Sequence, residues 1–99
     1  MADLTVKQLD EFEAGFGGSM KFVRDGLGVE SFGMQVIEMP ANADRYPEHD
    51  HSHDGQEEVY IALDGQATLQ AGGEEIQLTP GTFARVGPSE KRKIVTGDQ

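Results

Sequence analysis

The chain has 99 residues, and its 18 acidic and 8 basic residues give it a formal net charge of −10. A chain of this length supports one small domain, and an acidic chain without a basic stripe is a poor partner for nucleic acid or for an anionic membrane surface. It has no cysteine, which excludes disulfides and thiolate sites, and no apolar run near the roughly 18 residues of a membrane helix, so we expect a soluble, cytoplasmic protein.

A short helix or arm is predicted at the N-terminus, over residues 1–18. Thr5 can cap a helix that runs to about Ala14 and carries three apolar residues, Leu4, Leu9 and Phe12. The glycines that follow end this segment, and we expect it to form an arm that lies on the domain made by residues 19–99.

Short β-strands separated by turns are predicted for the rest of the chain. The predicted strands cover residues 20–24, 31–39, 57–63, 66–71, 74–78, 82–86 and 91–95. Apolar and polar residues alternate in several of them, and glycine or proline marks the turns between them. Asp64-Gly65 is typical of a two-residue hairpin, and Gly72-Gly73 marks another turn. The pattern predicts an all-β fold, an antiparallel barrel or sandwich.

The three histidines of the chain lie at alternate positions, His49, His51 and His53. Side chains alternate between the two faces of an extended strand, so these histidines would share a face, and Asp54 would point the opposite way. Neutral imidazoles bind first-row transition metals, and a carboxylate such as Glu58 can complete a mixed nitrogen and oxygen site. The simpler interpretation is a solvated surface strand.

The spacing of these residues resembles the first motif of the cupin superfamily, whose members are small β-barrels that hold a metal or a small ligand. The motif reads His51-x-His53, four residues, Glu58, six residues, Gly65. The resemblance implies that the two histidines and the glutamate are metal ligands, and that residues from about 20 onward form a jelly-roll barrel. Arg45 stands where the family pattern has a glycine.

The second cupin motif is matched by its two turns, Pro80-Gly81 and Gly87-Pro88, but its metal-binding histidine falls at Arg92. We consider three alternatives. His49 can complete a shell of three nitrogens and one carboxylate. The remaining two histidines and one carboxylate can bind the metal alone, which leaves positions for water and substrate. Otherwise no metal binds, and Arg92 pairs with Glu58 or holds an anionic ligand.

The resemblance implies a small cupin that binds a divalent transition metal (Fe, Mn, Ni, Zn, Co or Cu). It implies a metal-dependent oxygenase or isomerase of a small molecule, with Tyr60 or Glu58 as the catalytic group near the substrate. The alternative is a non-catalytic cupin that binds a small anionic ligand at Arg92 and has a degenerate metal site. A third hypothesis is a structural domain with a vestigial site.

We also expect a homodimer. Small cupins are commonly dimers, and one more strand normally follows the second motif in the family. Either that strand is missing from this sequence, or a partner subunit supplies the edge, since an unpaired edge favours pairing with another chain.

Overall fold

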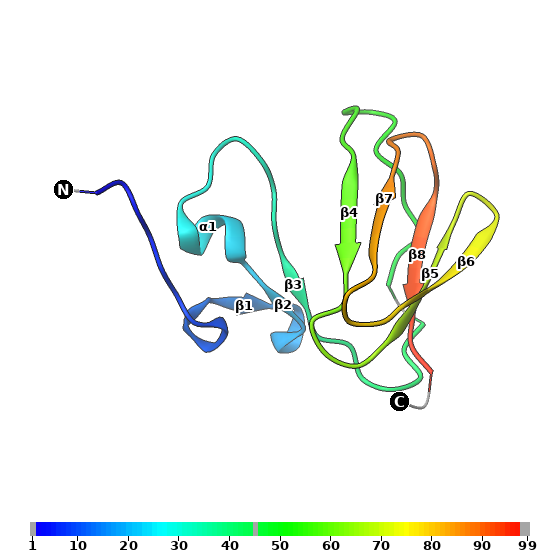
Figure 1. The fold of residues 1–99 in the computed structure, drawn as a ribbon, viewed down its shortest axis with the longest axis horizontal. Helices are drawn as coiled ribbons and strands as arrows, with labels where there is room; N and C mark the ends of the chain where they lie inside the picture. Colours follow the sequence, from blue (N-terminus) through cyan, green and yellow to red (C-terminus); the bar gives the residue numbers. More distant parts are fainter. Residues whose placement is uncertain (1, 45, 98–99) are drawn as a thin grey trace. The chain divides into compact units, whose positions relative to one another are not determined.

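The computed structural model describes residues 2–44 and 46–97, and the chain divides into two compact units, Met1–Met39 and Pro40–Gln99 (Figure 1). Residues 19–39, which we predicted as the beginning of the barrel domain, lie in the first unit. Arg45 lies outside the described residues, as do the last two residues of the chain. No helix in the described part of the chain is long and apolar enough to span a membrane.

The first unit contains a small antiparallel sheet in the order β1-β2-β3, formed by Ala14–Gly15, Met20–Lys21 and Val36–Ile37. Two 3-10 turns, η1 (Leu9–Glu11) and η2 (Phe16–Gly18), and one short helix, α1 (Val23–Leu27), complete the unit. The helix ends at Gly28, whose φ of 76° is a left-handed conformation that glycine adopts without strain.

Three predictions for the first unit are wrong. The helix predicted from Thr5 is reduced to the single turn η1, because its apolar residues bury no common face: Leu4 is 75% exposed, and such short helices are marginal without packing. The strand predicted over 20–24 ends at Lys21, and its continuation is α1. The strand predicted over 31–39 keeps only Val36–Ile37, and Phe32 and Met34 before it are exposed.

The second unit contains two antiparallel sheets. One pairs β4 with β7, and the other has the order β6-β5-β8. Their strands are β4 (Glu58–Ile61), β5 (Ala67–Ala71), β6 (Glu74–Leu78), β7 (Phe83–Val86) and β8 (Arg92–Val95). The core draws on both sheets, because its buried apolar side chains are Leu69, Leu78, Val86 and Ile94. The predicted all-β antiparallel class is therefore confirmed.

The two predicted hairpin signals of this unit have different outcomes. Gly72 and Gly73 join β5 to β6 with φ values of 58° and 78°, as a two-residue primed turn requires. Asp64-Gly65 makes a bend but no hairpin, because β4 pairs with β7 and β5 pairs with β6 and β8. Asp64-Gly65 specifies a change in chain direction, whereas β4 pairs with β7, a strand more than twenty residues later.

Candidate metal site

The second unit brings together side chains from the histidine segment, from β4 and from β8, and β8 is distant from the other two in the sequence. Glu58 and Tyr60 lie on the inward face of β4, and Arg92 begins β8. The segment before β4 runs beside β8, because His49 and Arg92 exchange two backbone hydrogen bonds of 3.0 and 2.8 Å. The next histidine is anchored to the turn before β8 by a bond from the His51 N–H to the Pro88 carbonyl, of 2.8 Å.

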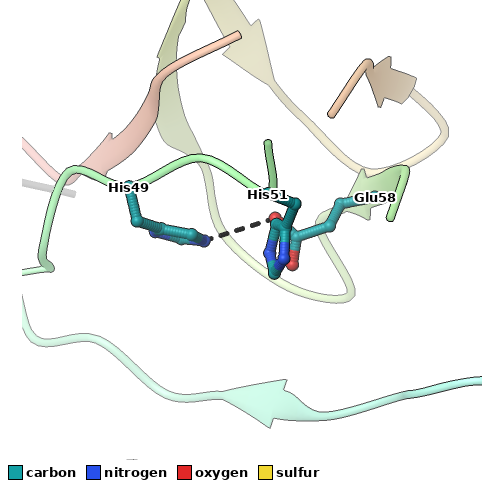
Figure 2. Close-up of side chains that lie close together, drawn as sticks. All are labelled: His49, His51 and Glu58. Atoms are coloured by element: carbon teal, nitrogen blue, oxygen red, sulfur yellow. Dashed lines mark ion pairs between the residues drawn. The ribbon is translucent and has the colours of Figure 1, made fainter. Parts of the chain in front are cut away.

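Two imidazoles face one carboxylate oxygen (Figure 2). The Nε2 atoms of His49 and His51 each lie 3.4 Å from Oε1 of Glu58. One ligand atom from each residue lies within 4.8 Å of the other two, so a single ion can reach all three. The His51 side chain is the most enclosed of the three, at 18% exposed.

The other ring nitrogen of each imidazole faces an atom that can only accept a hydrogen bond. Nδ1 of His49 lies 3.1 Å from the Pro47 carbonyl oxygen, and Nδ1 of His51 lies 3.2 Å from Oδ2 of Asp54. The hydrogen bond at one nitrogen decides which nitrogen of a neutral imidazole carries the proton. A neutral ring that carries its proton on Nδ1 donates to this acceptor and presents a lone pair at Nε2, toward Glu58.

This arrangement fits a metal ion. Nε2 of His51 is buried and has no hydrogen-bond partner among the described residues. With both ring protons on Nδ1, two nitrogen lone pairs and an anionic oxygen converge and repel one another, and a cation bound by all three removes the conflict. Two imidazoles and one carboxylate form a ligand set suited to first-row transition metals.

Glu58 stays anionic in this environment. Burial raises the pKa of its carboxyl group, but hydrogen bonds from Tyr60 and Arg92, with the nearby His51 and His49, outweigh burial and leave the pKa below its ordinary value. The Tyr60 hydroxyl and Nη1 of Arg92 each donate to Oε1 of Glu58 over 2.6 Å. The oxygen that faces the two imidazoles is thus fixed by two further donors.

Arg92 occupies the position of the missing motif histidine and is fully buried. Its pairing with Glu58, one of the two roles predicted for it, is present. Its Nε donates to the Glu90 carbonyl over 2.9 Å, and its Nη2 donates to the Gly87 carbonyl. A guanidinium has no lone pair to offer a metal, so Arg92 supplies a positive charge beside the site and no ligand.

Two tyrosines line the same inward region, and only Tyr60 was predicted. Burial, followed by the hydrogen bond to Glu58, raises the pKa of Tyr60 far above its usual range. Burial also raises the pKa of Tyr46, and a hydrogen bond with Tyr60 offsets only part of that increase. Both hydroxyls are therefore protonated at neutral pH. In the structure the ring centre of Tyr46 lies 5.6 Å from that of His49. The sequence signal that could have identified Tyr46 was its place beside Pro47, in the extended approach to the histidines.

The extended strand predicted through all three histidines ends at His51. Backbone bonds from Asp54 and Gly55 to the His51 carbonyl, of 3.2 and 2.7 Å, close a turn there. His53 therefore lies on the turn with 73% of its side chain exposed, 3.4 Å from Asp54 and outside the group around Glu58. A second potential ligand group contains His51, His53 and Asp54.

The Asp54 side chain does not have the orientation predicted from the sequence. We expected it to point away from the histidines, but the turn brings Oδ2 of Asp54 to Nδ1 of His51. A hydrogen bond from the Gln56 N–H is the main cause that lowers the pKa of Asp54, so this carboxylate is also anionic.

The fold and the site define a small antiparallel β-protein with a cluster of potential metal ligands inside. A family model described as the cupin domain matches residues 35–98, which is 64 of the 99 residues and includes every residue of the candidate site. The chain belongs to the cupin family, and its antiparallel sheets are those of a cupin jelly roll. Neither a curated protein nor a solved structure matches it.

Proposed function

We propose that this cupin binds one divalent transition metal ion through His49, His51 and Glu58, and that it acts on a small molecule as a metal-dependent oxygenase or isomerase. One observation carries the proposal: two imidazole nitrogens and a carboxylate oxygen converge, and one of the nitrogens is buried without a hydrogen-bond partner in the described part of the chain. The proposed ligands are three of the four residues predicted from the sequence, without His53.

The site has three protein ligands rather than four, because Arg92 occupies the position of the motif histidine that would be the fourth. A bound ion would act as a Lewis acid or oxygen-binding centre, with its other positions open to water and substrate. Arg92 and Tyr60 orient the ligand oxygen of Glu58 and balance its charge. Hydrogen-bond partners of this kind hold a metal-ligating side chain in place before an ion binds.

Tyr60 is the favoured catalytic group. Glu58 serves as a ligand, and its Oε1 already accepts two hydrogen bonds, so it is poorly placed to take a proton from a substrate. The Tyr60 hydroxyl stays protonated at neutral pH and lies beside the ligand oxygen. Its single O–H can donate to a substrate oxygen when it turns from Oε1 of Glu58, which Arg92 continues to hold.

The alternative, a non-catalytic cupin that holds an anion at Arg92, has less support. The Arg92 side chain is fully buried, and its hydrogen bonds go to Glu58 and to two backbone carbonyls. An anion would have to displace these acceptors. The small-molecule ligand and the cytoplasmic location stay predictions.

The first test measures metal content and affinity. Protein without a polyhistidine tag, grown in metal-supplemented medium, should contain close to one equivalent by mass spectrometry of the metals. After chelation, a free metal concentration about 100 times the Kd should raise the free energy of unfolding by about 2.7 kcal/mol.

His49→Ala and His51→Ala should both lose this stabilisation, whereas the exposed His53→Ala should keep it. Metal content below about a tenth of an equivalent in wild type would contradict the proposal. An equal loss in His53→Ala and His51→Ala would show that the family spacing, rather than the observed group, identifies the ligands.

A further inference from the structure

The Asp54 carboxylate points at the outer ring nitrogen of His51, and we infer from the geometry that Asp54 is a positioning residue for the metal site. In this inference, which rests on the proposed metal site, Asp54 holds the His51 proton on Nδ1 and so keeps the Nε2 lone pair free for the ion. Oδ2 of Asp54 lies 3.2 Å from Nδ1 of His51, while Nε2 faces Glu58.

The turn that follows His51 holds the Asp54 carboxylate in place. Its Oδ1 accepts a hydrogen bond of 3.1 Å from the Gln56 N–H. Its own N–H donates to the His51 carbonyl over 3.2 Å. The aspartate is therefore tied to the histidine through both the backbone and the side chain.

Two carboxylates compete for the single proton of neutral His51. Asp54 accepts it at Nδ1, whereas Glu58 would accept it at Nε2, where Oε1 lies 3.4 Å away. If the proton moved to Nε2, it would bond to Glu58 and no lone pair would face the ion. Because Oε1 of Glu58 already accepts from Tyr60 and Arg92, the proton is better placed on the Asp54 side.

His49 provides an internal comparison. The acceptor at its Nδ1 is the backbone carbonyl of Pro47, at 3.1 Å, which no side-chain substitution removes. Loss of the Asp54 carboxylate should therefore move the proton on His51 and leave the proton on His49 where it is. A general loosening of the fold would not separate the two rings in this way.

The first measurement follows the ring protons in metal-free protein labelled with ¹⁵N at histidine. Long-range proton–nitrogen correlations at about pH 8, above the ordinary imidazole pKa of about 6.5, distinguish the two tautomers of a neutral ring. In wild type, His49 and His51 should both carry the proton on Nδ1. In Asp54→Ala, His51 should shift to the Nε2–H form, and His49 should not. Asp54→Asn, whose amide oxygen can still accept, should restore much of the wild-type pattern.

The second measurement is zinc affinity by competition with a chromophoric chelator. Asp54→Ala should weaken binding about 10- to 100-fold, as loss of a partner behind a ligating histidine does. The matched control is Asp50→Ala, because the Asp50 carboxylate lies in the same segment but, among the described residues, accepts hydrogen bonds only from Ser52. Its affinity and tautomers should match those of wild type.

An unchanged His51 tautomer in Asp54→Ala, or equal zinc affinities of Asp54→Ala and Asp50→Ala, would overturn the inference. A loss in His53→Ala as large as that in Asp54→Ala would also overturn it, in favour of an ion held by the second ligand group, His51, His53 and Asp54. A wild-type protein that binds no zinc would contradict the proposed function, and the tautomer measurement would still decide whether Asp54 places the proton.

Discussion

Arg92 connects two of the three proposed ligands. Its guanidinium donates to Glu58, and its backbone exchanges two hydrogen bonds with His49. A buried charge costs several kcal/mol of desolvation unless acceptors satisfy it, and here a carboxylate and two carbonyls do so. The arginine therefore fixes the distance between β8, β4 and the histidine segment without binding the ion itself.

Replacement of this arginine should destabilise the fold. Arg92→Met keeps most of the side-chain volume but removes the cation beside Glu58 and the side-chain donors to the Glu90 and Gly87 carbonyls, of which the Gly87 carbonyl keeps the Glu90 N–H at 3.3 Å. We expect a loss of about 2–4 kcal/mol in the free energy of unfolding, measured with urea at neutral pH on metal-free protein.

The control is Lys93→Met, the next residue on β8, for which the structure describes no ion pair. It should change stability by less than about 0.5 kcal/mol. Equal unfolding midpoints of the two variants would show that the buried pair contributes nothing measurable.

Glu58 predicts a dependence of stability on acid. Its folded-state pKa lies below the ordinary value of 4.5, so the folded state binds a proton less readily than the unfolded state does. The resulting stabilisation is fully present above that ordinary value and is lost as the pH falls through the lower, folded-state pKa. Stability should therefore decrease on acidification within this window.

The measurement compares wild type with Glu58→Gln by urea unfolding of metal-free protein in steps from about pH 6 to pH 3. The stability difference between the two proteins should shrink as the pH falls, because the variant cannot titrate at this position. The other acidic residues titrate in both proteins and cancel in the difference. A stability difference between the two proteins that stays constant from about pH 6 to pH 3 would be inconsistent with a lowered pKa at Glu58.

At the scale of elements, the sequence predicted best where local chemistry decides the outcome. The β5–β6 hairpin follows from two adjacent glycines that adopt positive φ. β7 and β8 lie within the predicted ranges, because proline and glycine bound each of them and a buried side chain, Val86 or Ile94, holds each in the core. The pairing of strands was harder to predict, because Asp64-Gly65 does not indicate that β4 pairs with the distant β7.

The candidate site was predictable in its composition but not in its selection of ligands. Alternation placed three histidines on one face, and the motif spacing added Glu58 and drew attention to Arg92. Which two histidines meet the carboxylate depends on the turn after His51, in which the Asp54 carboxylate accepts a hydrogen bond from the Gln56 N–H and the Asp54 N–H donates to the His51 carbonyl. Such bonds compete with an extended strand, and a residue pattern alone does not show which of the two forms.

An apolar face of the second unit is a candidate surface for the assembly of two chains. The outward side chains of β4, β7 and the bend after β4 are exposed, namely Val59, Ile61, Leu63 and Phe83. Ile61 and Phe83 are cross-strand partners, so this outer face is continuous. In a chain with a net charge of −10 it carries one exposed ion pair, between Glu57 and Arg85 at 2.6 Å.

We expect a second copy of the chain to cover this outer face. Contiguous exposed apolar surface marks interaction sites, and two acidic chains approach each other with least repulsion where the surface is neutral. In a two-fold arrangement each Glu57 can also face the partner's Arg85, because the same patch meets itself. The predicted homodimer would then use a sheet face rather than only a strand edge.

Sedimentation velocity and light scattering over a concentration series should give the mass of two chains for wild type and of one chain for Phe83→Lys, because a charge at the centre of an apolar interface is left unpaired. Leu4→Lys is the control, since Leu4 is equally exposed but lies in the first unit, and it should remain a dimer. A monomeric wild type would rule out the dimer. A Phe83→Lys protein that still forms dimers would place the interface on another surface of the chain.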